Sequence, residues 1–176
     1  MAELFVRNFR FAVRLRRSPA EVAGRTPSGA GSLAADAADG AALCNGAFQE
    51  VSGLEIGMDV GEHLEGGRND GAIRCAGRAR YAPIVLRRGM FYGGAGGRAE
   101  LDRSLWRWFQ DTVAGVRPIA RYDGVIEVLG SGSEVVATWE FDRGLPARIR
   151  GPALNARTGD VAIEELHIAH EGLRLA

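Results

Sequence analysis

Short segments in which polar and apolar residues alternate, separated by turns rich in glycine, recur along this chain. The clearest of them begins at Phe9 and has two unlike faces. One face is apolar and the other is mostly arginine: Phe9, Phe11, Val13 and Leu15 against Arg10, Ala12, Arg14 and Arg16. Successive side chains of a β-strand point to opposite sides, so this alternation predicts a strand with one side on a core.

Further segments of the same kind predict an antiparallel architecture. We expect two or three strands across residues 43–64, then strands at 72–80 and 84–88, a hairpin from 121–129 to 134–142, and extended segments at 147–154 and 160–173. One helix is predicted over about residues 98–113, from apolar residues spaced three and four apart: Leu101, Leu105, Trp108, Phe109 and Thr112. The predicted fold class is mainly β, a two-sheet antiparallel β-barrel or sandwich with one flanking α-helix.

The length of 176 residues predicts a single domain, residues 1–176, because a chain of this size builds one core and not two large ones. Residues 18–42 consist mainly of Gly, Ala, Ser, Pro and Asp and contain hardly any large apolar side chain. We interpret them as a flexible Gly/Ala-rich insertion between two strands.

The charges balance, with 22 acidic and 22 basic residues, and every basic residue is an arginine. A protein that binds nucleic acid through its phosphates normally carries a basic excess, so we predict no sequence-specific nucleic-acid partner. Trp106 and Trp108 do not change this, because Trp108 lies on the apolar side of the predicted helix and Trp106 is expected under a neighbouring strand or subunit. Zero net charge permits dense self-association, and arginine suits bidentate pairing with carboxylates at interfaces.

No targeting or membrane segment is expected. Arg7 and Arg10 interrupt the first residues, where a signal peptide needs an apolar run, and no apolar run approaches the roughly 20 residues of a spanning helix. Two cysteines, Cys44 and Cys75, are too few for a disulfide scaffold and are expected to be reduced. The prediction is a protein made in the cytoplasm without a signal peptide.

Candidate chemical groups are few. Residues 164–170 contain two carboxylates and two imidazoles, but in a strand His167 and His170 point to opposite faces, so surface or interface positions are favoured over a metal site. The glycines at 93–97 lack the Gly-Lys-Ser/Thr ending of a phosphate loop, and Ser52 lacks the surroundings of a nucleophile elbow. We predict no catalytic residue, no cofactor, no metal and no enzymatic activity.

Several stretches occur in one order along nearly the whole chain: Phe9–Phe11, Phe48–Glu55, Glu65–Gly67, Leu86–Gly89, Leu105–Trp108, Trp139–Phe141, Gly151–Asn155, Val161–Glu164 and His170–Leu173. The stretches from Gly151 onward are the most specific. Together they resemble the tube proteins of contractile phage tails and of the related extracellular contractile injection systems. The insertion at 18–42 looks longer than the usual turn of that family, which leaves open whether the chain is the major tube subunit or an initiator-ring subunit.

The resemblance implies a ring-forming tube protein fold, shared with the tube protein of type VI secretion. It implies a structural inner tube subunit, of which six copies close into a ring and rings stack into a hollow tube that is driven through a target envelope and has a lumen for cargo. The implied partners are further copies of the chain, the sheath, baseplate and tube-terminating proteins, and cargo, in a phage tail or a released extracellular particle. A small β-barrel enzyme and a monomeric binding module remain the alternatives.

Mixed charges and glycines around residues 62–74 suit a protruding hairpin. We expect ring stacking or another subunit contact to use six polar residues of this region: Glu62, Glu65, Arg68, Asn69, Asp70 and Arg74.

Overall fold

The computed structural model describes residues 10–19, 42–46, 48–67, 70–93, 100–157 and 159–176. In that part of the chain it places twelve strands and one helix. The first six strands are β1 (Phe11–Arg17), β2 (Ala42–Gly46), β3 (Glu50–Ser52), β4 (Ile56–His63), β5 (Ile73–Tyr81) and β6 (Ile84–Gly89). The remaining elements are β7 (Tyr92–Gly93), β8 (Glu100–Leu101), α1 (Ser104–Val113), β9 (Tyr122–Leu129), β10 (Val135–Arg150), β11 (Ile163–Ala169) and β12 (Gly172–Leu175).

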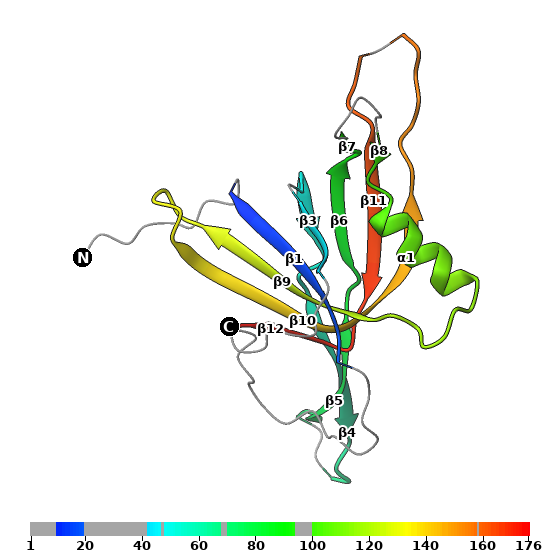
Figure 1. Ribbon diagram of the computed structural model, residues 1–176. Coiled ribbons are helices and arrows are strands. Elements are labelled where there is room, and N and C mark those ends of the chain that lie inside the picture. The colour runs from blue at the N-terminus through cyan, green and yellow to red at the C-terminus, as the bar shows by residue number, and fades with distance from the viewer. Residues whose placement is uncertain (1–9, 20–41, 47, 68–69, 94–99, 158) are drawn as a thin grey trace.

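Strand β10 belongs to two sheets. Its first part pairs with β9 and β12, and its last part pairs with β11. Sheet A contains β2, β1, β9, the first part of β10, and β12, whereas sheet B contains the last part of β10, β11, β6 and β3. Every pair in both sheets is antiparallel, and Figure 1 shows β10 curving from one sheet into the other. The predicted fold class, mainly β with two antiparallel sheets and one helix, is confirmed.

One core forms where the two sheets face each other and α1 closes the side. The buried apolar side chains come from both sheets and the helix: Val13, Leu15, Phe48, Ile84, Leu86, Leu105, Trp108, Ile126, Phe141, Leu166, Ile168 and Leu173. The faces predicted for the first strand are confirmed, because Val13 and Leu15 are buried and Arg16 is exposed. Phe9 lies outside the described residues.

The helix is shorter than the predicted 98–113, because α1 begins only at Ser104. Residues 100–101 instead form the strand β8, which pairs with β7. Asp102 then separates strand from helix, and its Oδ1 accepts a hydrogen bond from the backbone N–H of Ser104 at 2.9 Å. An aspartate that bonds the backbone two residues ahead favours a turn over a continued helix, so the periodicity overestimated the helix by about a turn and a half.

The predicted hairpin is confirmed as β9 and the beginning of β10, but β10 continues to Arg150. The separate extended segment predicted at 147–154 is therefore wrong, since its first residues belong to β10. The segment predicted at 160–173 divides into β11 and β12.

Most of the predicted insertion at 18–42 lies outside the described residues, as do residues 94–97 of the predicted glycine cluster. The two ends of the insertion both attach to sheet A. The backbone N–H of Ser18 donates to the carbonyl oxygen of Arg121 at 2.8 Å, and β2 begins at Ala42. The single-domain organisation of residues 1–176 stays a prediction.

Gly124 in β9 faces the ring of Phe141, which is fully buried, and a Cβ at position 124 would lie 2.0 Å from Phe141 Cε1. We expect Gly124→Ala to lower the free energy of unfolding by about 1–3 kcal/mol, the usual cost of overpacking a core. Urea denaturation measures this cost. Gly66→Ala is the control, because a Cβ at Gly66 would meet nothing within 4 Å. Equal stability of both variants would contradict the packing described for Phe141.

Candidate assembly surfaces and the networks that shape them

The bend of β10 lies where the strand leaves sheet A. Its pairing with β9 is irregular between Phe141 and Gly144, and Arg143 has a φ of 55°. This left-handed backbone costs a non-glycine residue about 1–2 kcal/mol. Gly144 comes next, and a Cβ there would lie 2.7 Å from Ile168 Cγ2. The bend therefore requires a small residue at 144 and contacts that hold Arg143 in a strained conformation.

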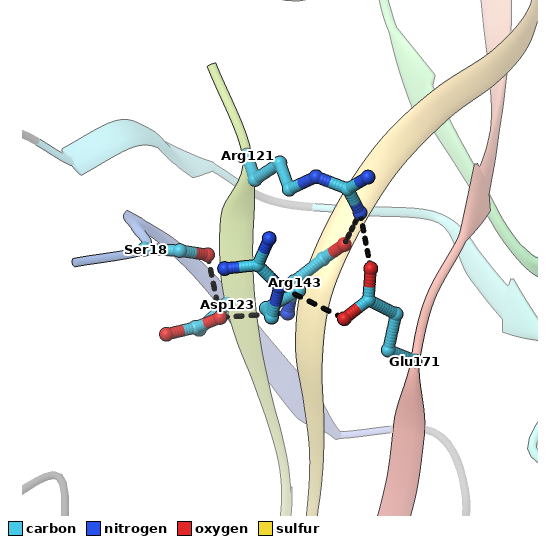
Figure 2. A network of polar contacts seen from close by, with 5 residues as sticks. All are labelled: Ser18, Arg121, Asp123, Arg143 and Glu171. Atoms are coloured by element: carbon cyan, nitrogen blue, oxygen red, sulfur yellow. Dashed lines mark hydrogen bonds and ion pairs between the residues drawn. The ribbon is translucent and has the colours of Figure 1, made fainter. Parts of the chain in front are cut away.

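A network of five polar residues supplies those contacts, as Figure 2 shows. Asp123 Oδ1 accepts hydrogen bonds from the backbone N–H of Arg143 at 2.8 Å and from the hydroxyl of Ser18 at 2.6 Å. Arg121 donates to the carbonyl oxygen of Arg143 at 3.0 Å and to Glu171 Oε1 at 2.7 Å. Arg143 Nε donates to Glu171 Oε2 at 2.8 Å. The ends of β1, β9 and β11 are thus bound to one point of β10.

The strain at Arg143 can be separated from its ion pair. Arg143→Ala and Arg143→Gly both lose the contact with Glu171, but only glycine adopts a positive φ without a steric penalty. We expect the alanine variant to be about 1 kcal/mol less stable than the glycine variant in urea denaturation. At Thr138, in the regular part of β10, the order should reverse, because glycine weakens an ordinary strand. If the alanine and glycine variants at position 143 are equally stable, the backbone of Arg143 is not strained.

A second network is buried between sheet B and α1. Arg88 and Glu164 are only 2% and 1% exposed, and Arg88 Nε donates to Glu164 Oε1 at 2.6 Å. Arg88 Nη1 also donates to Asp102 Oδ2 at 2.9 Å, and Trp106 Nε1 donates to Glu164 Oε2 at 2.8 Å. Burial raises the pKa of Asp102, but hydrogen bonds from Ser104 and the guanidinium of Arg88 outweigh burial and bring that pKa below its ordinary value. The network joins β6, β11 and the beginning of the helix.

The sequence argument missed this buried pair. It favoured surface or interface positions for the polar residues of 164–170, which is wrong for Glu164 and Glu165, because both are buried. A usable signal exists, because Arg88 follows Arg87 and Glu165 follows Glu164 within alternating segments. Adjacent residues of a strand face opposite sides, so one member of each like-charged pair must face the core.

Removal of the charge of Glu164 should leave Arg88 buried with an incomplete set of partners and lower the stability of the fold. Glu164→Gln keeps the shape of the side chain but removes the carboxylate that Arg88 Nε binds, while the ion pair of Arg88 with Asp102 stays. We expect a loss of stability near the lower end of the about 3–5 kcal/mol typical of a broken buried ion pair, measured by denaturant unfolding. Glu50→Gln removes a pair exposed to solvent and should cost about 0–1 kcal/mol. If Glu164→Gln and Glu50→Gln lower the free energy of unfolding by the same small amount, Glu164 is not in a buried ion pair.

The outer face of sheet B carries a third network, centred on Arg87. Arg87 Nε donates to Glu165 Oε2 at 2.7 Å, and Arg87 Nη1 donates to Glu50 Oε2 at 2.9 Å. His167 Nε2 lies 2.7 Å from Glu165 Oε1. Hydrogen bonds from His167 and Arg87 lower the pKa of Glu165 to about 2, against the opposing effect of burial. This carboxylate therefore stays ionised through the whole physiological range.

The hairpin formed by β4 and β5 extends away from both sheets at one end of the molecule (Figure 1). Three apolar side chains of β4 alternate along one of its faces, namely Ile56, Met58 and Val60, and each is more than half exposed. We call these three residues the apolar row. On the other face the guanidinium of Arg80 donates to both oxygens of Asp59, at 2.8 and 2.9 Å. The hairpin contributes no buried residue to the core.

The structure brings the predicted stacking residues together at the tip of this hairpin. Glu62 and Arg74 are directly opposite each other in β4 and β5. Glu65 and Asp70 lie in the connection between the strands, and all four are exposed. The other two predicted residues, at 68–69, lie outside the described residues. That these six residues take part in ring stacking stays a prediction.

The two histidines do not share a site. His167 contacts Glu165, whereas His170 Nδ1 and Nε2 lie 2.9 and 3.0 Å from the carbonyl oxygens of Gly172 and Ala82. In the part of the chain that is described, no three His, Cys, Asp or Glu residues are grouped so as to hold a metal ion. Within the same residues, no helix combines the length and the apolar character needed to span a bilayer.

Trp108 is buried, as predicted, and its indole N–H donates to the carbonyl oxygen of Ala120 at 2.9 Å. Trp106 is half-buried: its ring lies beside Gly151 at the end of β10, and its indole N–H is bound to Glu164. The buried indole of Trp108 is therefore not available as a stacking platform for bases.

The family of the T4-like virus tail tube protein gp19 matches residues 7–174. The chain belongs to this family. The tail tube protein is therefore a structural protein and not an enzyme, and the predicted family is confirmed. No curated protein sequence matches it significantly.

Solved structures contain chains with the fold of this tail tube protein. A chain of the 6-fold symmetrised anti-feeding prophage (AFP) baseplate superimposes with a TM-score of 0.69 at 24% identity, over 100% of this chain and 97% of that chain. A chain of the PVC sheath-tube complex, from an extracellular contractile injection system in its extended state, superimposes with a TM-score of 0.66 at 19% identity. The match covers 99% of this chain and 93% of that chain. A chain of the AFP tube terminating cap superimposes with a TM-score of 0.66 at 16% identity, over 100% of this chain and 93% of that chain.

Proposed function

We propose that this tail tube protein is an inner tube subunit of a contractile phage tail or extracellular contractile injection system. Six copies close into a ring, and the rings stack into a hollow tube that is driven through a target envelope and has a lumen for cargo. The 6-fold symmetrised baseplate that contains a chain of the same fold supports the ring of six. Among the described strands, β2 in sheet A and β3 in sheet B each pair with a single neighbour, which also favours assembly, because unpaired strand edges are ready sites for pairing with another chain.

The exposed hairpin of β4 and β5 is the observation that supports the stacking of rings. Its apolar row leaves large hydrophobic side chains in solvent, which marks an interaction surface. Strands β7 and β8 and the loop between β10 and β11 lie at the opposite end of the molecule (Figure 1). Phe91 is 47% exposed there and Tyr92 77%. Two unlike complementary ends form a heterologous contact, which repeats along an axis and builds a filament.

Sheath, baseplate and tube-terminating proteins are the further partners that we propose. Chains with the same fold come from a baseplate, from a sheath-tube complex and from a tube terminating cap. The particle to which the chain contributes is a phage tail or a released injection device.

Negative-stain electron microscopy of the purified protein tests both parts of the proposal. Wild-type protein should form six-fold rings and stacked tubes. The variant Met58→Asp/Val60→Asp should still form rings but shorten the tubes several-fold, because charges on the apolar row prevent its burial between rings. The control Val113→Asp/Val116→Asp adds the same charge at exposed positions in and just after α1 and should leave tube length unchanged.

Two results would count against the proposal. A wild-type protein that remains an 18.8-kDa monomer at high concentration contradicts the ring. Tubes of unaltered length from the Met58→Asp/Val60→Asp variant contradict the stacking role of the hairpin while leaving the ring in place.

A further inference from the structure

His170 lies in the short connection between β11 and β12, and both of its ring nitrogens face backbone carbonyl oxygens. Nδ1 is 2.9 Å from the carbonyl oxygen of Gly172, and Nε2 is 3.0 Å from that of Ala82. A carbonyl oxygen only accepts hydrogen bonds, so each ring nitrogen must donate a proton to make its contact. A neutral imidazole carries one N–H, whereas the imidazolium carries two. Both contacts are therefore hydrogen bonds only when His170 is protonated.

Two aromatic rings flank the imidazole of His170. The ring centroid of Tyr81 lies 5.4 Å and that of Phe141 lies 5.6 Å from the centroid of the imidazole ring. Aromatic rings within about 6 Å attract a cation through their π-electrons. The imidazole is thus surrounded by two carbonyl oxygens and two aromatic rings, all of which favour a positive charge on it.

The two carbonyl oxygens belong to different parts of the molecule. Gly172 begins β12, which pairs with β10 in sheet A. Ala82 follows β5 at the base of the β4–β5 hairpin, where its backbone N–H donates to the carbonyl oxygen of Glu55 at 3.3 Å. Among the described strands, β4 and β5 pair only with each other, so contacts at the base decide how firmly the hairpin is held. His170 therefore connects the hairpin to sheet A.

We propose that His170 is a proton-dependent latch, which fastens the base of the hairpin to sheet A when its ring carries both protons and releases it when one proton is lost. Histidine ordinarily changes its charge between about pH 5 and 8, so the latch would operate in the physiological range. The latch belongs to a single subunit and does not depend on the proposed ring.

The direction of the pH dependence follows from the number of hydrogen bonds. The imidazolium binds two carbonyl oxygens, whereas a neutral ring keeps one of these bonds and turns a lone pair toward the other oxygen. The fastened hairpin therefore binds the second proton more tightly than the released hairpin does. By linkage, the fastened state is favoured at low pH and is lost as the pH rises.

The neighbouring elements hold other charged and titratable groups. Their carboxylates are bound to arginines, Glu171 to Arg121 and Arg143, and Asp142 to Arg174. Tyr81 contacts the imidazole through its ring, and a tyrosine hydroxyl titrates well above the range of histidine. Glu55, across the base of the hairpin, is exposed to solvent. Carboxylates titrate below that range, so His170 is the group of this cluster whose charge changes between about pH 5 and 8.

Hydrogen–deuterium exchange of the backbone amides tests the latch. The readout is the protection factor of peptides that cover residues 53–57 and 79–83, which corrects for the pH dependence of exchange itself. We expect the protection of these peptides in wild-type protein to fall at least about fivefold from pH 5.5 to pH 8.5, because a hydrogen bond from a charged group is stronger than a neutral one. Peptides from β9 should keep their protection. Light scattering checks that the assembly state is the same at both pH values.

His170→Gln separates the proton from the polar contact. A glutamine amide donates N–H groups and has no charge that depends on pH, so we expect protection at the base to change by less than about twofold between the two pH values. His63→Gln is the matched control, because His63 is an exposed histidine at the end of β4 in the same hairpin. This control should behave like wild type. Circular dichroism checks that both variants are folded.

The protons on the ring can also be observed directly in wild-type protein. The chain contains three histidines, so ¹⁵N-histidine labelling gives few signals, and His63→Gln and His167→Gln assign two of them without any change at His170. We expect both ring nitrogens of His170 to carry protons at pH 5.5 and only one to do so at pH 8.5. The loss of the second proton should coincide with the fall in protection.

Three results overturn the latch. They are equal protection of the wild-type hairpin base at both pH values, a His170 ring with a single proton at pH 5.5, and a pH-dependent loss of protection that persists in His170→Gln. Each of them leaves the proposed ring and tube intact. A wild-type protein that forms no rings overturns the proposed function and leaves the latch in place.

Discussion

The membership of β10 in two sheets is the constraint on which the rest of the structure depends. A single strand can serve both sheets only if it bends, and the bend requires a left-handed residue at Arg143 with a glycine behind it. The backbone of Arg143 is held by Arg121, just before β9, and by Asp123, within that strand. The facing of the sheets, and with it the enclosed core, follows from this one corner.

The chain contains arginine but no lysine, and its ion pairs use the planar guanidinium that lysine lacks. Arg87, Arg88 and Arg174 each bind two carboxylates from different positions, which a planar guanidinium with several donors does without rearrangement. Burial lowers the pKa of Arg174, but Asp142 and Glu140 outweigh burial and raise it. Six carboxylates are thereby paired with three arginines within the chain.

Local patterns predicted those parts of the fold that local physics decides. Alternation correctly placed Val13 and Leu15 in the core, and the spacing of three and four placed Trp108 there. The start of the helix and the length of β10 were missed because both depend on partners distant in sequence, namely the pairing of β7 with β8 and of β10 with β11. The tip of the hairpin was predicted from its charges, but the apolar row was not, since exposure is a property of the whole fold.

The hairpin of β4 and β5 projects from the body of the molecule and contributes no residue to its buried core. Its connection to the body is narrow: Gly53, with a φ of 85°, lies against Pro83 so closely that a Cβ would be 2.0 Å from the Pro83 carbonyl oxygen. Tyr81 at the base of the hairpin contacts His170, with ring centroids 5.4 Å apart, but no side chain of β4 or β5 belongs to the buried core. Residues can therefore be gained or lost toward the tip of the hairpin at little cost to folding. The length of this arm is thus only weakly tied to the folding of the body from which it projects.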